Sequence, residues 1–344
     1  MEPVVYAQRP STAVFVARAL CARSTWARRR KFPDLRLIWR RYVVQAHDVD
    51  KLLMLAGVAD RQASAPVLLL APHVTGFPLL TAMLTHPSWP IPIWRALQVR
   101  NRLSQHGPVR LGETFDLVAE VSGWRILEKG IEVDVQSRLQ SGDDTRWESA
   151  VTFYYKGTHA PGENHGQALG APPVPPKIDD EAQPLARWRV DPIGKWAFAS
   201  LTGDYNPIHQ WNWYARRLGF RVASAHSQRI AAKCLSHLPV SNGGVRQLDL
   251  WIKGPVYFGG EVVQRQAQNE RRRRARFRRL DDRRRSPRAG RQVDDETAGT
   301  HLGEIDPRAH RIDVTSRCRQ SRHADSLSSI FPHGMSGAAS LCRS

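Results

Sequence analysis

Cysteine is scarce, and its four positions, Cys21, Cys234, Cys318 and Cys342, lie far apart in the chain. No two of them have the close spacing of a zinc site or the density of a disulfide framework, so we expect reduced thiols and no bound metal. No apolar run reaches the ~20 residues that a membrane-spanning helix needs. The early apolar run at 14–17 is interrupted by Arg18 and does not have the form of a secretory signal. We therefore expect a cytoplasmic protein with no membrane partner.

Acidic residues are few relative to basic ones, because 51 Lys and Arg face only 32 Asp and Glu, a net charge of +19. Residues 264–344 hold 19 Arg, no Lys and 10 acidic residues, so this last quarter carries +9 of that excess. Its Arg runs contain a single aromatic side chain, Phe277, whereas stacking on successive bases needs several interleaved aromatic side chains. Binding of nucleic acid through the basic tail therefore remains a less favoured alternative.

Large apolar side chains are also rare in residues 264–344, where Val, Ile, Leu and Phe total 11 of 81 residues and Trp and Tyr are absent. This share is below the ~20% typical of folding segments. Arg-rich, Lys-free sequence is what out-of-frame translation of G+C-rich DNA tends to give. We hypothesise that the reading frame shifts near Gln264, and a genuine basic tail is the alternative. In either case we expect the tail to be disordered.

The rest of the chain has the composition of folded protein, with 41% hydrophobic residues and 11 Trp overall. Proline punctuation and hydrophobic patterning divide the chain into five segments. They are a basic N-terminal arm at 1–33, a first α+β unit at 34–158, a Pro-rich linker at 159–184, a second α+β unit at 185–263, and the tail at 264–344.

Alternating and continuous apolar runs predict the elements of both units. In the first unit they predict strands at 35–44, 114–121, 130–137 and 147–155, and a buried helix at 76–85 with Pro78 in its first turn. In the second unit they predict a helix from Asp191-Pro192 to Gly203, a helix at 227–238, a strand at 243–253 that pairs with the first sheet, and a hairpin beginning at 256–263.

The most informative segment, Leu201–His209, reads Leu-Thr-Gly-Asp-Tyr-Asn-Pro-Ile-His. It places the carboxylate of Asp204 five residues before the imidazole of His209, on a loop that Pro207 stiffens. A carboxylate and an imidazole held on one loop can transfer protons to and from water. A polar turn without chemistry is the alternative for this segment alone.

The flanks of the loop carry a further pattern: Trp196-Ala-Phe-Ala-Ser before it, then Tyr214-Ala-Arg-Arg-Leu-Gly-Phe and Ala225-His-Ser-Gln after it. Together these blocks resemble the MaoC-like family of hotdog-fold hydratases and dehydratases. The resemblance implies an α+β double hotdog, in which each unit is a central helix wrapped by antiparallel strands. The first unit lacks the Asp/His loop, so it resembles the degenerate, non-catalytic first half of double-hotdog relatives, and the second unit would lack its final strands.

The resemblance implies that Asp204 and His209 hydrate trans-2-enoyl thioesters to (R)-3-hydroxyacyl thioesters and catalyse the reverse dehydration, and it leaves open which of the two is the base. The substrate would be carried by coenzyme A or acyl carrier protein, with no other cofactor. Asn206 and Ser227 are candidate substrate contacts, although Asn206 can also cap its own turn. The chain departs from the family at Ser227 and Gln228, where Gly and Met are usual. We expect His226 to pack at a helix start rather than to catalyse.

Two other functions stay open. A hotdog protein could bind acyl thioesters without catalysis, because a fold alone does not fix function. The basic tail could bind nucleic acid, with an affinity that falls steeply with salt. The resemblance is also compatible with a homodimer.

Overall fold

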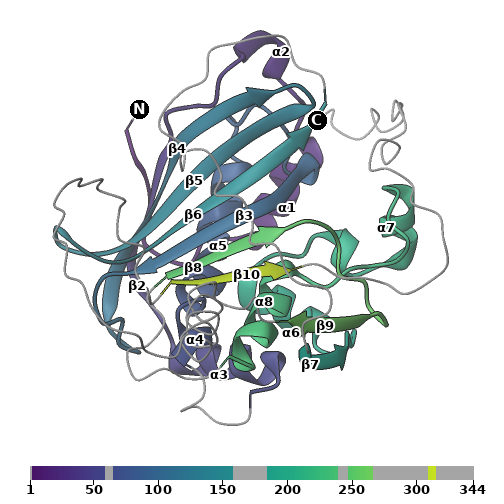
Figure 1. The fold of residues 1–344 in the computed structure, drawn as a ribbon. Helices are drawn as coiled ribbons and strands as arrows, with labels where there is room; N and C mark the ends of the chain where they lie inside the picture. Colours follow the sequence, from purple (N-terminus) through teal and green to yellow (C-terminus); the bar gives the residue numbers. More distant parts are fainter. Residues whose placement is uncertain (1, 59–64, 158–183, 239–246, 266–308, 315–344) are drawn as a thin grey trace, which may run out of the picture.

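The computed structural model describes residues 2–58, 65–157, 184–238, 247–265 and 309–314 (Figure 1). The linker at 159–183 and most of the tail lie outside these described residues. The helices are α1 (Thr12–Cys21), α2 (Trp26–Arg29), α3 (Ala46–Ala56), α4 (Ala65–Leu68), α5 (Ala71–Leu84), α6 (Lys195–Thr202), α7 (Asn212–Arg217) and α8 (Ser227–Ser236), with short 3-10 helices at Ile93–Arg95 (η2) and Pro207–His209 (η3). The strands are β1 (Val4–Tyr6), β2 (Arg36–Val43), β3 (Ala96–Gln105), β4 (Thr114–Leu127), β5 (Gly130–Ser141), β6 (Asp144–Lys156), β7 (Pro184–Arg189), β8 (Gln247–Ile252), β9 (Glu261–Arg265) and β10 (Ala309–Val314).

Eight strands form one sheet in the order β1-β2-β4-β5-β6-β3-β8-β10. The inner pairs are antiparallel, and only the two edge pairs, β1–β2 and β8–β10, are parallel. The pairing of β3 with β8 joins the first unit to the second, with Asn101 opposite Leu250 and Leu103 opposite Leu248. The prediction that the strand after residue 243 pairs with the first sheet is therefore confirmed.

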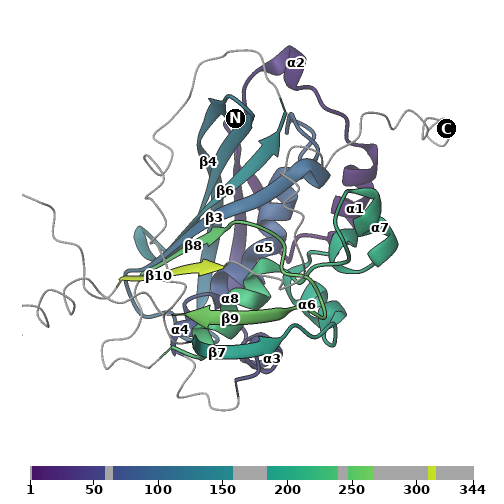
Figure 2. The same cartoon turned by 45° about the vertical axis from the view of Figure 1, so that its right-hand side comes forward.

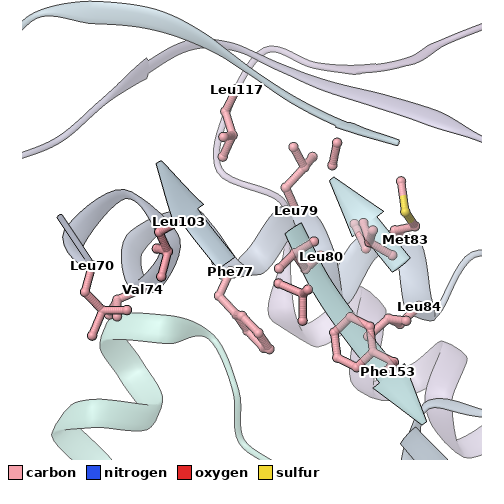
Figure 3. Packing of buried hydrophobic residues seen from close by; sticks show 14 of the residues in the cluster. Leu70, Val74, Phe77, Leu79, Leu80, Met83, Leu84, Leu103, Leu117 and Phe153 are labelled. Carbon is pink, nitrogen blue, oxygen red and sulfur yellow. The ribbon is translucent and has the colours of Figure 1, made fainter. Parts of the chain in front are cut away.

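Helix α5 lies against the inner face of this sheet, and all 14 of its residues are buried. Figure 3 shows side chains of this helix packed among residues of the surrounding strands. The labelled residues are Leu70, Val74, Phe77, Leu79, Leu80, Met83, Leu84, Leu103, Leu117 and Phe153. Burial of apolar area at about 25 cal/mol per Å² makes this cluster a main source of stability.

The start of α5 differs from the sequence prediction. The helix begins at Ala71, five residues earlier than expected, and Pro72 rather than Pro78 occupies its first turn. Pro78 therefore lies in the helix interior, where its missing N–H leaves the carbonyl of Val74 without its helical donor. The surrounding apolar contacts outweigh this local cost, so the helix continues through the proline.

The N-terminal segment was expected to be an arm, but it packs on the first unit. Strand β1 pairs in parallel with β2, and Phe15, Trp26 and Phe32 are buried in the main core. The ring of Phe32 contacts four other aromatic rings, those of Trp26, Trp89, Trp124 and Tyr155. The basic stretch at 28–31 is solvent-exposed, as predicted for a solvated cluster.

The second unit has a smaller core of its own beneath α8, formed by Val190, Ala225, Ile230, Cys234, Val256 and Val262. Helix α8 starts at Ser227 as predicted and ends at Ser236. The strand expected within 256–263 is β9, which among the described strands pairs antiparallel with β7 in a sheet separate from the main one, with Trp188 opposite Val262. The second strand of the predicted hairpin would lie outside the described residues. Trp188 and Val262 lie 74 residues apart in sequence, so no local turn signal could indicate this pairing.

One segment of the tail contradicts the expectation of disorder. Residues Ala309–Val314 form β10, which pairs in parallel with β8 from Gln247 to Ile252. An open strand edge offers backbone N–H and C=O groups to any extended segment, so low apolar content does not prevent pairing. The remaining tail residues lie outside the described part of the chain. Within the described residues, no helix combines the length and apolar character that crossing a bilayer requires.

Candidate active site

Helix α6 delivers the first site residue. It ends at Gly203, whose φ of 73° lies in the left-handed region that glycine adopts without strain. This reversal turns the chain out of the helix directly before Asp204, as the sequence predicted. The predicted start was wrong, because α6 begins at Lys195 with Gly194 as N-cap. The Asp191 side chain instead accepts a hydrogen bond from the N–H of Ile193 at 2.7 Å and forms a local turn.

The loop from Asp204 to His209 is held by two successive side-chain turns. Asp204 Oδ1 accepts from the N–H of Asn206 at 3.1 Å, and Asn206 Oδ1 accepts from the N–H of Ile208 at 3.2 Å. Asn206 is thus the cap of η3, so its acceptor oxygen is already used. This geometry favours the turn-capping interpretation of Asn206 over substrate contact.

His209 is oriented by the segment that precedes α8. Its Nδ1 lies 2.8 Å from the carbonyl oxygen of Ser224, and the N–H of Ser224 donates back to the carbonyl of Ile208 at 3.2 Å. Because a carbonyl only accepts, Nδ1 carries the proton of the neutral ring, and Nε2 is left with a lone pair. The fold therefore fixes both the direction and the tautomer of this imidazole.

His226 packs at the start of α8, as expected, and also contacts both His209 and Asp204. Its ring stacks on that of His209, with centroids 3.9 Å apart and planes inclined by 30°. Its Nε2 lies 3.0 Å from the backbone carbonyl of Asp204 and 3.7 Å from Asp204 Oδ2. The side chain is only 2% exposed, and this burial, assisted by the nearby His209, lowers the pKa of His226 to about 3. A neutral His226 thus donates to the catalytic loop and holds it against α8.

The three side chains form one compact cluster, since the ligand atoms of Asp204, His209 and His226 all lie within 4.8 Å of one another. One carboxylate and two imidazoles are donors that divalent metals accept. The Nδ1 of His209 and the Nε2 of His226 are, however, bonded to backbone carbonyls. The absence of a bound metal stays a prediction, and the hydrogen bonding favours proton transfer as the use of the cluster.

Ser227 opens α8 next to this cluster. As in any α-helix, the first N–H groups of α8 have no intrahelical partner. The Ser227 hydroxyl donates to Gln228 Oε1 at 3.1 Å, and Gln228 Nε2 donates to Gln98 Oε1 of β3. The sequence identified Gln228 as a departure from the family but could not indicate Gln98, which lies 130 residues away and is brought close by the sheet.

Known proteins resemble the chain in sequence and in fold. The chain matches no protein-family model. It is 26% identical over 184 residues to 3-hydroxyacyl-thioester dehydratase X of Mycobacterium tuberculosis, a match that covers 53% of this chain and 63% of that relative. It thus spans less than two thirds of the length of this relative.

A solved structure shows the same fold at low sequence identity. A MaoC-like dehydratase from Phytophthora capsici superposes with a TM-score of 0.57 at 16% identity, over 70% of this chain and 86% of that one. The structure of HtdX from Mycobacterium tuberculosis superposes with a TM-score of 0.49 at 19% identity, over 66% of this chain and 85% of that one.

The fold is that of an α+β protein of the double-hotdog class. Antiparallel strands wrap a buried helix, and the pairing of β3 with β8 joins this unit to a second unit that contains a helix. Within that class, the chain is similar in sequence to the mycobacterial 3-hydroxyacyl-thioester dehydratase and similar in fold to the MaoC-like dehydratase of Phytophthora capsici.

Proposed function

We propose that this protein is a hydro-lyase that interconverts trans-2-enoyl and (R)-3-hydroxyacyl thioesters. The observation that carries the proposal is the bond from His209 Nδ1 to the Ser224 carbonyl, which leaves Nε2 as a proton acceptor on a ring that belongs to the same cluster as the Asp204 carboxylate. Homology to a 3-hydroxyacyl-thioester dehydratase supports the same chemistry.

In the hydration direction, the oxygen of water forms a bond to C3 while His209 Nε2 takes one of the water protons. The π electrons of the C2=C3 bond shift toward C2 and the thioester carbonyl. A proton from the acid/base pair is then delivered to C2, so that the net change is the addition of one water molecule. Dehydration runs through the same groups in reverse, with His209 donating to the departing hydroxyl.

Asp204 has two roles in this proposal. Its carboxylate lies in the same cluster as the ring that becomes positively charged, so it stabilises the imidazolium. Its Oδ1 is fixed by the Asn206 N–H, which leaves Oδ2 as the oxygen free to orient water. We assign the base in hydration to His209, because its tautomer is set by the Ser224 bond.

The thioester carbonyl needs a donor as negative charge develops on its oxygen. The start of α8 at Ser227 supplies unpaired backbone N–H groups and the positive end of the helix dipole. Because a backbone N–H serves here, the replacement of the usual glycine by Ser227 keeps the donor, and its hydroxyl is directed to Gln228.

The direct test is hydration of a short trans-2-enoyl thioester, followed by the loss of the absorbance of the conjugated double bond. We expect Asp204→Asn and His209→Ala each to lower kcat by about 10²-fold or more. Asp191→Asn is a matched control, because it alters an exposed carboxylate in a local turn of the same unit. Thioester binding without turnover by the unaltered chain would instead support a non-catalytic acyl-binding protein.

A further inference from the structure

Three exposed tryptophans form a continuous surface, which we call the tryptophan ridge: Trp196, Trp211 and Trp213. Their exposed fractions are 47%, 43% and 61%. Trp196 meets Trp211 edge to face, with ring centroids 5.6 Å apart, and Trp211 lies 6.5 Å from Trp213 with ring planes inclined by 29°. Large apolar side chains gathered on a surface usually mark a binding site.

The ridge begins beside the catalytic loop. Trp211 follows His209 by two residues, and Lys195 Nζ donates to the carbonyl of Gln210 at 2.6 Å, which ties α6 to this segment. Helix α7, which carries Trp213, lies at the rim of the molecule, away from strands β4, β5 and β6, in both views (Figures 1 and 2). A molecule bound on the ridge would therefore lie at the edge of the candidate active site.

The residues next to the ridge in sequence are basic. Residues 205–220 contain no Asp or Glu, but they include Arg216 and Arg217. Arg216 and Arg217 follow Trp213 by three and four residues in α7, so all three share one helix face. Within the described part of the chain, neither of these two arginines forms an ion pair. The face thus combines an exposed indole ring with two uncompensated guanidinium groups.

We propose that the tryptophan ridge and the α7 arginines bind the adenine nucleotide of a coenzyme A thioester. The adenine would stack on the indole rings, and the phosphates would pair with Arg216 and Arg217. This inference rests on the proposed function, since it names the carrier of the acyl group that reaches Asp204 and His209.

A nucleotide fits these features better than an acidic carrier protein. The centroids of Trp211 and Trp213 are separated by nearly twice the ~3.5 Å contact distance of carbon atoms, so a planar base can contact both rings. Guanidinium groups match phosphate oxygens with two parallel hydrogen bonds. Bases stack on aromatic side chains strongly enough for one truncation to weaken binding by about tenfold or more.

Binding can be measured without catalysis, by titrating the full chain with coenzyme A and with pantetheine and following heat release. We expect Trp213→Ala and the pair Arg216→Ala with Arg217→Ala each to weaken coenzyme A binding by about tenfold or more. Trp94→Ala is a matched control on an exposed indole, 41% accessible, in η2. Arg28→Ala is the charge control, because α2 lies apart from α7 in both views. Equal losses in the controls would overturn the proposal.

Kinetics with two substrates separate this proposal from the proposed function. For the enoyl thioester of coenzyme A, Trp213→Ala should raise KM about tenfold, whereas for the enoyl thioester of pantetheine KM should not change. If neither thioester reacts but coenzyme A still binds through Trp213, the proposed function fails and the ridge proposal stands. If Trp213→Ala leaves coenzyme A binding unchanged and weakens only the binding of an acyl carrier protein, the nucleotide assignment is wrong.

Discussion

Two buried histidines should make the folded protein sensitive to mild acid, and His73 offers the cleaner test. It lies in the first turn of α5 and is 2% exposed, with Nδ1 3.3 Å from the hydroxyl of Ser149. Burial lowers the pKa of His73 from its ordinary value of 6.5 to about 3. His226 has the same depression for the same main reason.

The sign follows from proton uptake. Between pH 6.5 and pH 3 the unfolded chain binds a proton at His73 that the folded protein excludes, so acid favours unfolding. The stability contributed by the neutral ring is complete above pH 6.5 and is lost progressively as the pH falls toward 3. From pH 7 to pH 5 the loss is ~2 kcal/mol per histidine. This loss of stability hardly depends on the exact pKa of the buried histidine, because pH 5 lies well above that pKa.

The perturbation is His73→Asn, which removes the titration and keeps an amide near the Ser149 hydroxyl. Urea unfolding at pH 7 and pH 5 should show that the unaltered protein loses ~2 kcal/mol more than the variant. His47→Asn is the control for the loss of an imidazole, because the His47 side chain is 77% exposed. If His73→Asn and the unaltered protein lose stability equally, the buried neutral state of His73 is refuted.

Three further outcomes are expected. Gly203→Ala should destabilise the protein by ~1 kcal/mol and lower kcat, because Gly203 has a positive φ and directs the chain into the loop. Gly112→Ala, also at a positive φ but with nothing within 4 Å of the added Cβ, should lower stability and leave kcat unchanged. Equal losses of kcat in the two variants would contradict this expectation. His226→Phe should lower kcat about tenfold with little change in KM. His226→Gln should lower kcat less, because Gln can still donate a hydrogen bond to the Asp204 carbonyl. A larger loss of kcat in His226→Gln than in His226→Phe would refute the role of that bond. Limited proteolysis should cut first within 159–184, because a proline-rich stretch exposes backbone, and first cuts within 114–156 would exclude the proposed linker.

Local patterns in the sequence were sufficient for the central elements of the fold. The apolar run near Gly76 predicted the buried helix α5, and alternation predicted β4, β5 and β6. Gly203 and the spacing from Asp204 to His209 predicted the loop of the candidate site, because its turns depend on neighbouring residues alone.

Features that depend on distant contacts were not predictable from local sequence. The core contacts of Phe32 in the N-terminal segment and the pairing of β7 with β9 are made between residues far apart in the chain. The stack of His226 on His209 requires α8 to pack against the loop, so the sequence suggested only a helix start. The interior position of Pro78 was missed because tertiary packing offsets its local cost.

A double-mutant cycle on Asp204 and His209 tests the central claim most directly. The measurement is kcat/KM for enoyl thioester hydration by the unaltered chain, by Asp204→Asn, by His209→Ala and by the double variant, each checked for retained fold. Residues that act as one unit have grossly non-additive effects, so we predict that the double variant is nearly as active as the more impaired single variant. Single variants with near-normal kcat/KM, or a double variant whose loss is the product of the two single losses, would contradict an acid/base pair.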